Sequence, residues 1–328
     1  MPSPGRENDS GEGDPKETGK SLLPGPSRCP YPLRMALLSL LRTLLLLGRV
    51  SNLPTVWTNV AAGWFLSGGG WAAELGWIVL GMSLVYVAGM TLNDAFDAEW
   101  DREHAARRPI PAGRIRWGTV WCVGTLELFS GMTVLALLTS THAILLVGIV
   151  FAILLYNWLH KRWAGSVLLM GLCRALVYVG AGSAVAAHTD ALEVPFSLLA
   201  VAGGIVLYIA GLTLVARTEH LENPGGLRLF PRLLLMLPVL FGPIVYRFAP
   251  DDLANLSLLV LGIVGVASWL VIVRRALAER VPKGIAFAIA GIAFYDAAAV
   301  AFADWRAAVA CLACFVLTLG LQRVVPAT

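Results

Sequence analysis

The chain has 328 residues, of which 57% are hydrophobic and 14% charged, and its mean hydropathy is +0.72. These values exclude an ordinary soluble domain and indicate an integral membrane protein. The protein is expected to be helical, because the sequence shows no series of the short alternating segments that are typical of a membrane barrel. The net charge of +4 is dispersed over short loops, which does not favour nucleic-acid binding.

The chain reads as one membrane domain behind a polar tail. Residues 1–34 are rich in Gly, Pro, Ser and charge, which predicts a disordered cytoplasmic tail, and residues 35–324 form the predicted membrane domain. Residues 35–50 carry Arg42 and Arg49 in a leucine-rich stretch, as an interfacial amphipathic helix does. We expect an all-α polytopic integral membrane bundle with nine or ten transmembrane helices around a central cavity. The spanning candidates are 53–67, 72–96, 117–139, 143–159, 164–187, 195–215, 229–246, 253–273, 284–302 and 305–321.

The loop charges predict the orientation of these spans. Basic residues gather after the second, fourth, sixth and eighth spans, whereas the opposite connections are mainly acidic. The positive-inside rule therefore places the loop after the second span on the cytoplasmic side of the plasma or inner membrane.

An acidic stretch closes the second span. Asn93, Asp94, Asp97 and Asp101 lie three or four positions apart, so on a continuing helix they share one stripe. Oxygen ligands without nearby His or Cys point to a hard ion such as Mg²⁺, which completes its shell with water and substrate phosphates. The basic residues just beyond are suited to phosphate charge; they are Arg102, Arg107, Arg108 and Arg114. The alternative is a solvated acidic helix end paired to its own arginines.

Several charged residues lie inside predicted spans, and besides Glu127 in the third span two stand out. Arg174 is in the fifth and Asp296 in the ninth. Each costs roughly 2.5–3.5 kcal/mol in a bilayer, so each is expected to face a cavity or a partner. Either Arg174 adds positive potential to an anionic pocket, or the two residues form an interhelical ion pair.

The sequence Asn93-Asp94-x-x-Asp97-x-x-x-Asp101, followed by Arg108-Pro109-Ile110-Pro111-x-Gly113, resembles the first signature of the UbiA-type intramembrane prenyltransferases. Within that superfamily the chain looks most like the EboC-like branch. The resemblance implies an isoprenoid diphosphate bound through Mg²⁺ at two acidic motifs, with Asn93, Asp94, Asp97 and Asp101 as the first metal site. It also implies that Arg108 and Lys161 contact diphosphate and that Asn52 lines the cavity entrance.

The second acidic motif departs from the family pattern. In place of aspartates the chain has Arg217-Thr218-Glu219-His220-Leu221-Glu222. Glu219 and Glu222 could form a weaker metal site, or Arg217 could supply fixed positive charge to the leaving diphosphate. A third alternative is a site that binds an isoprenoid without reacting it.

These patterns together predict Mg²⁺-dependent transfer of a prenyl group from an isoprenoid diphosphate to an aromatic or otherwise lipophilic acceptor within the membrane. The alternatives are a non-catalytic isoprenoid-binding or export-assisting protein on the same fold, and an ion-coupled transporter using Arg174 and Asp296. The catalytic candidates are Asp94, Asp97, Lys161, Arg217 and Glu219. The substrate-binding candidates are Asn52, Asn93, Arg102, Arg108, Tyr156 and Arg174, and the metal-ligand candidates are Asn93, Asp94, Asp97, Asp101, Glu219 and Glu222.

Overall fold

The structure is a computed structural model that describes residues 33–187, 194–218, 229–247 and 253–325. The chain divides into two units, residues 1–38 and 39–328. Of the first unit only 33–38, the start of helix α1, is described, so the predicted tail falls almost entirely outside the described residues.

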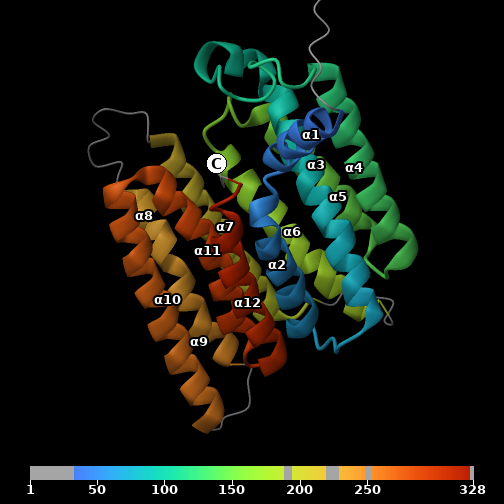
Figure 1. Cartoon of the computed structure of the whole chain (residues 1–328). Coiled ribbons are helices and arrows are strands. Elements are labelled where there is room, and N and C mark those ends of the chain that lie inside the picture. Colours follow the sequence, from blue (N-terminus) through green and yellow to red (C-terminus); the bar gives the residue numbers. More distant parts are fainter. Residues whose placement is uncertain (1–32, 188–193, 219–228, 248–252, 326–328) are drawn as a thin grey trace, which may run out of the picture. The chain divides into compact units, whose positions relative to one another are not determined.

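Every element in the described residues is helical, as predicted (Figure 1). The elements are α1 Leu33–Leu47, η1 Val50–Asn52, α2 Leu53–Leu66, α3 Ala73–His104, α4 Trp117–Leu138, α5 Ala143–Leu159, α6 Ser166–Ala186, α7 Phe196–Thr218, α8 Leu229–Met236, η3 Leu237–Leu240, α9 Phe241–Tyr246, α10 Leu253–Glu279, α11 Val281–Val300 and α12 Trp305–Leu321.

Six helices in the described residues are long and apolar enough to cross a membrane, which makes this an integral membrane protein. They are α3, α4, α6, α7, α10 and α11. A seventh span results if α1 and α2 act together across a bend of 52°, and α5 and α12 are shorter apolar helices. The predicted count of nine or ten transmembrane helices therefore depends on whether these shorter and bent segments also cross the membrane.

The seventh predicted span, residues 229–246, is not one helix. It is broken into α8, η3 and α9, with Pro238 inside η3 and Pro243 inside α9. A proline lacks the backbone N–H and its ring clashes with the carbonyl four residues earlier, so two prolines this close prevent a continuous helix.

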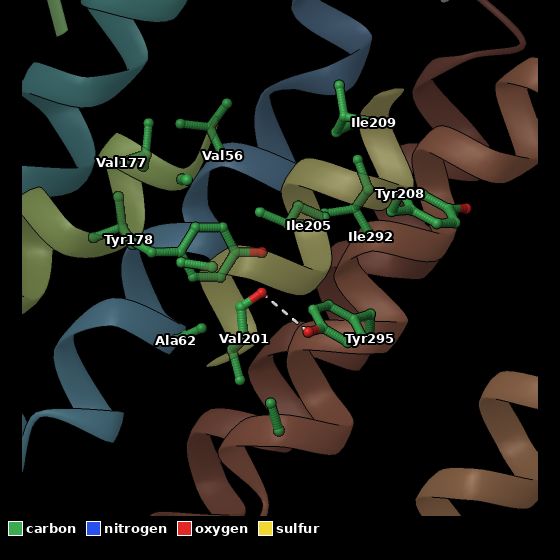
Figure 2. Packing of buried hydrophobic residues seen from close by; sticks show 14 of the residues in the cluster. Val56, Ala62, Val177, Tyr178, Val201, Ile205, Tyr208, Ile209, Ile292 and Tyr295 are labelled. Atoms are coloured by element: carbon green, nitrogen blue, oxygen red, sulfur yellow. Dashed lines mark hydrogen bonds between the residues drawn. The ribbon is translucent and has the colours of Figure 1, made fainter. Parts of the chain in front are cut away.

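The core forms where α2 packs against α3, α6, α11 and α12. Close approach of α2 and α6 requires glycine, because a Cβ on Gly63 would lie 2.1 Å from the carbonyl oxygen of Tyr178. Figure 2 shows labelled core residues of α2, α6, α7 and α11 meeting, with the Tyr295 hydroxyl donating to the Val201 carbonyl at 3.0 Å. Beside this core, α3 and α4 run side by side (Figure 1) and carry the acidic stretch at one end.

Candidate active site

The acidic stretch lies on the last turns of α3, which continues unbroken through it to His104. Asn93, Asp94, Asp97 and Asp101 are all buried, with exposed fractions of 6%, 8%, 4% and 1%. The predicted stripe is therefore confirmed as a buried face. Burial of three carboxylates is costly unless cations compensate their charge.

The loop after α3 folds back and delivers one such cation. The N–H of Arg108 donates to the Ala105 carbonyl, and Gly113 adopts a positive φ of 69° that favours glycine, so the loop turns sharply. Nη1 of Arg108 then lies 2.9 Å from Asp101 Oδ2, 3.3 Å from Asp94 Oδ1 and 3.8 Å from Asp97 Oδ2. One guanidinium nitrogen thus occupies the point where the three carboxylates converge.

The end of α5 supplies further contacts to the same site. His160 Nε2 lies 3.1 Å from the Asp97 carboxylate, and Lys161 Nζ lies 3.5 Å from Asp97 Oδ2. Lys161 also sits 3.7 Å from the centroid of the Trp100 ring, which holds the ammonium by a cation–π interaction. The Asn93 amide donates to Asn157 Oδ1 at 3.2 Å and thereby ties α3 to α5.

Arg217 holds the α5–α6 loop in place. Its guanidinium donates to the carbonyls of His160 and Ala164, at 2.8 and 3.2 Å, and to the Ser166 hydroxyl at 2.8 Å. These contacts fix the segment that carries His160 and Lys161. The structure thus shows Arg217 in a positioning contact, and its supply of positive charge to the leaving diphosphate stays a prediction.

The donor chemistry at α3 suits a hard cation. Within the described residues no three His, Cys, Asp or Glu side chains are grouped as a metal site, and Arg108 occupies the point between the three carboxylates. Oδ1 of Asp101 is nevertheless buried and, in the described part of the chain, has no hydrogen-bond partner. Carboxylate oxygens with unused acceptor capacity are ligands that Mg²⁺ favours, so the residues fit this ion once Arg108 moves aside.

An apolar pocket opens beside this site, between α2, α3, α5 and α6. Its cavity volume is about 60 Å³, and its lining is mainly apolar. Tyr156 and Asn157 line the pocket, and the Tyr156 ring stacks on His160 at 5.1 Å between centroids. Tyr156 and Asn157 therefore connect the pocket to the acidic stretch.

Arg174 also lines the pocket, and it makes no direct ion pair with Asp296. Arg174 Nη1 donates to Asn59 Oδ1 at 2.6 Å, and Asn59 Nδ2 donates to Asp296 Oδ2 at 2.8 Å. Asp296 is fully buried and also accepts from the hydroxyls of Thr58, at 2.6 Å, and Tyr178, at 2.5 Å. The two predicted intramembrane charges are thus linked through a neutral amide.

Several predicted residues are not brought to the stripe. Arg102 is exposed near the end of α3, and Asn52 is buried where Gln322 of the α12 end donates to its Oδ1 at 3.4 Å. Glu219 and Glu222 lie outside the described residues. Conversely, sequence reasoning missed His160 as a contact of Asp97.

Sequence reasoning also missed Arg49, whose charge lies near enough to interact with Asp94. Its φ of 45° is unusual for a residue with a side chain and marks a strained turn before α2. At His160 and Arg49 the only signal in the sequence was the polarity or charge of the residue.

Comparisons with known proteins concern the chain's family and fold. Over 71 residues the chain is 35% identical to the digeranylgeranylglyceryl phosphate synthase of Pyrococcus horikoshii. That match covers 22% of this chain and 26% of the relative, so the chain spans about a quarter of that protein's length.

Two solved structures have a similar fold. A UbiA homologue from Aeropyrum pernix K1 has a TM-score of 0.62 at 16% identity, covering 76% of this chain and 96% of that chain. A UbiA homologue from Archaeoglobus fulgidus, bound to DMAPP and Mg²⁺, has a TM-score of 0.52 at 15% identity, covering 78% and 99%. At these identities the likeness concerns the fold alone.

Residues 53–272 match the UbiA prenyltransferase family, a stretch that runs from the first residue of α2 into α10 and includes the acidic stripe and Lys161. Because this match covers well over half of the chain, the protein belongs to the UbiA prenyltransferase family.

Proposed function

We propose that the protein transfers a prenyl group from an isoprenoid diphosphate to a lipophilic acceptor inside the membrane. The observation that carries this proposal is the convergence of three buried carboxylates on one cation position, directly beside an apolar pocket. A catalytic centre of this kind needs both a place for diphosphate charge and a dry chamber for the prenyl carbon chain. The site would face the cytoplasm, as the loop charges predict.

In this proposal Asn93, Asp94, Asp97 and Asp101 hold Mg²⁺, with Glu219 and Glu222 as further candidates. When bound, the ion acts as a Lewis acid that stabilises negative charge on the departing diphosphate. Arg108 and Lys161 bind the diphosphate oxygens, and Arg217 keeps the Lys161 loop in position.

The reaction breaks the bond between the allylic C1 and oxygen, and the electron pair leaves on diphosphate. The acceptor's nucleophilic atom then donates a pair to C1, and the acceptor loses a proton to solvent. The apolar walls exclude water from the carbocation, and Tyr156 presents a ring that stabilises positive charge. This makes the protein a transferase of alkyl groups other than methyl, and we place it in the EboC-like branch.

The test measures diphosphate release by the purified full chain in lipid nanodiscs, with C10 to C20 prenyl diphosphates and a host lipid extract as acceptor source. We expect release that requires Mg²⁺ and is lost in Asp97→Asn. Asp304→Asn is the matched control, because Asp304 caps α12 by accepting from the Ala307 N–H, which asparagine also does. Saturable diphosphate binding without release would instead support a non-catalytic isoprenoid-binding protein.

A further inference from the structure

A groove of about 320 Å³ separates α8 from α10. On α10 its wall consists of residues spaced three or four positions apart, which share one face of the helix. The wall residues of α10 are Leu270, Val273, Arg274 and Leu277, and those of α8 include Leu233 and Met236. Leu233 and Met236 are exposed, so the groove opens to the surface of the bundle.

The groove exists because α8 is short and packs on a different helix. α8 lies mainly against α7 and has little contact with α10, although α8 and α10 are found on the same side of the bundle (Figure 1). After eight residues α8 gives way to η3, which contains Pro238, so it does not continue along α10. The space left between the two helices is therefore open to the surrounding lipid.

Arg274 lies at the depth of lipid headgroups. The stretch of α10 from Leu253 to Val273 carries no charged residue. On a helix these residues rise by about 30 Å, which is the thickness of the hydrocarbon core of a bilayer. Arg274 is the first residue beyond that length, so its guanidinium is level with the phosphates of one leaflet. Leu270 and Val273 lie on the hydrocarbon side of it.

The charge around Arg274 is positive and uncompensated. Residues 274–283 include four basic side chains and one acidic side chain. The acidic one, Glu279, already pairs with Lys283 at 2.8 Å. Arg274 is exposed, and no ion pair of its guanidinium is found within the described residues. All five of its N–H donors are thus available to an anion from the membrane.

We propose that the groove between α8 and α10 binds a glycerophospholipid whose headgroup carries a net negative charge. One acyl chain lies along Leu270 and Val273, and the phosphate pairs with the guanidinium of Arg274, whose planar fork matches two phosphate oxygens. A zwitterionic lipid offers the same phosphate but adds an ammonium group, which the neighbouring Arg275 and Arg280 repel. The proposal is independent of the proposed function, because no groove residue belongs to the acidic stripe or to the pocket beside it.

The test compares dioleoyl phosphatidylglycerol with dioleoyl phosphatidylcholine, which share their acyl chains and differ in headgroup charge. Binding of each lipid to the delipidated full chain in a neutral detergent is measured by native mass spectrometry. We expect the wild-type protein to bind phosphatidylglycerol about 5-fold more tightly, the effect of one arginine at a membrane surface, and Arg274→Gln to bind both lipids equally. Arg275→Gln is the matched control, because Arg275 is the exposed neighbour and lies outside the groove lining, so it is expected to keep the preference.

Leu233→Trp tests the apolar wall of the groove. Leu233 is 53% exposed, so a larger side chain is accommodated without disturbing the core, but it narrows the groove. We expect this variant to bind both lipids more weakly and to keep the ratio of their affinities.

Equal affinity of the wild-type protein for the two lipids, or a preference that survives in Arg274→Gln, would overturn the proposal. A loss of equal size in Arg275→Gln is also contrary to it, because attraction would then come from the whole basic surface and not from the groove. If Arg274→Gln does not fold, Leu233→Trp decides, since unchanged lipid binding in that variant places the lipid elsewhere. A two-chain mass that Leu233→Trp abolishes would assign the groove to a second copy of the chain, against the proposal.

Discussion

Arg108 competes with a metal ion for the acidic stripe, and removing its charge tests this directly. In the structure, Nη1 of Arg108 contacts Asp94, Asp97 and Asp101 at 2.9 to 3.8 Å. Magnesium can bind those oxygens only after the guanidinium leaves. We therefore expect Arg108→Gln to bind a divalent cation more tightly than the wild-type protein when no prenyl diphosphate is present.

The size of the effect follows from the contacts. Two unit charges about 4 Å apart interact by about 4 kcal/mol at an effective dielectric constant of 20. The Arg108 side chain is 35% exposed, so water screens much of this, and exposed pairs are worth about 1 kcal/mol or less. For three carboxylates sharing one guanidinium we take about 2 kcal/mol, which corresponds to roughly a 30-fold gain in metal affinity.

The assay is a titration with Mn²⁺, followed by electron paramagnetic resonance of the free ion, without prenyl diphosphate. Arg107→Gln is the matched control, because Arg107 is the exposed neighbour and its described contact is made by its backbone carbonyl. Unchanged Mn²⁺ affinity in Arg108→Gln, or an equal gain in Arg107→Gln, would refute the reasoning. Despite its tighter metal binding, Arg108→Gln is expected to release diphosphate more slowly.

Three further variants test other parts of the structure. Gly63→Ala is expected to lower the midpoint of thermal unfolding, because the added Cβ would lie 2.1 Å from the Tyr178 carbonyl oxygen. Gly203→Ala is the control: the space around Gly203 is open, so this variant is expected to leave the midpoint unchanged or to raise it. Tyr178→Phe removes a buried hydroxyl that both donates to Asp296 and accepts from Asn59, and we expect a loss of about 1–3 kcal/mol in the free energy of unfolding, measured by denaturant titration; an unchanged value speaks against the network. Arg217→Gln frees the Lys161 loop, so KM for prenyl diphosphate is expected to rise with little change in kcat in steady-state kinetics, and the opposite split would give Arg217 a direct catalytic role.

Sequence patterns predicted most helices because apolar length and bounding loops are local properties. The spans at 143–159 and 305–321 match α5 and α12 to the residue. At 229–246 the hydropathy pattern predicted a span, and the structure shows a helix broken near the prolines at 238 and 243. Their effect on the backbone is as local as hydropathy, so this break could have been predicted.

The geometry of the candidate site was likewise predictable where it depends on local structure, and not where it depends on tertiary packing. The three- and four-residue spacing predicted that the carboxylates share a face of α3, since a helix sets that geometry alone. The position of Arg108 depends on how the loop turns at Gly113, and His160 approaches Asp97 from a helix 63 residues away in sequence. Such contacts result from tertiary packing, which local sequence patterns do not specify.

The hydrogen bonds to Asp296 have a consequence for how the chain is assembled during synthesis. Thr58 and Asn59 enter the bilayer with α2, yet their acceptor arrives with α11, 238 and 237 residues later. Until then they lack the Asp296 carboxylate and rely on their other partners, the Thr55 carbonyl for Thr58 and the Tyr178 hydroxyl for Asn59, in a medium where an unmet donor is costly. The hydrogen bonds to Asp296 can therefore form only after α11 has left the ribosome, and a chain truncated before α11 would lack them even though α2 could still pack against α6.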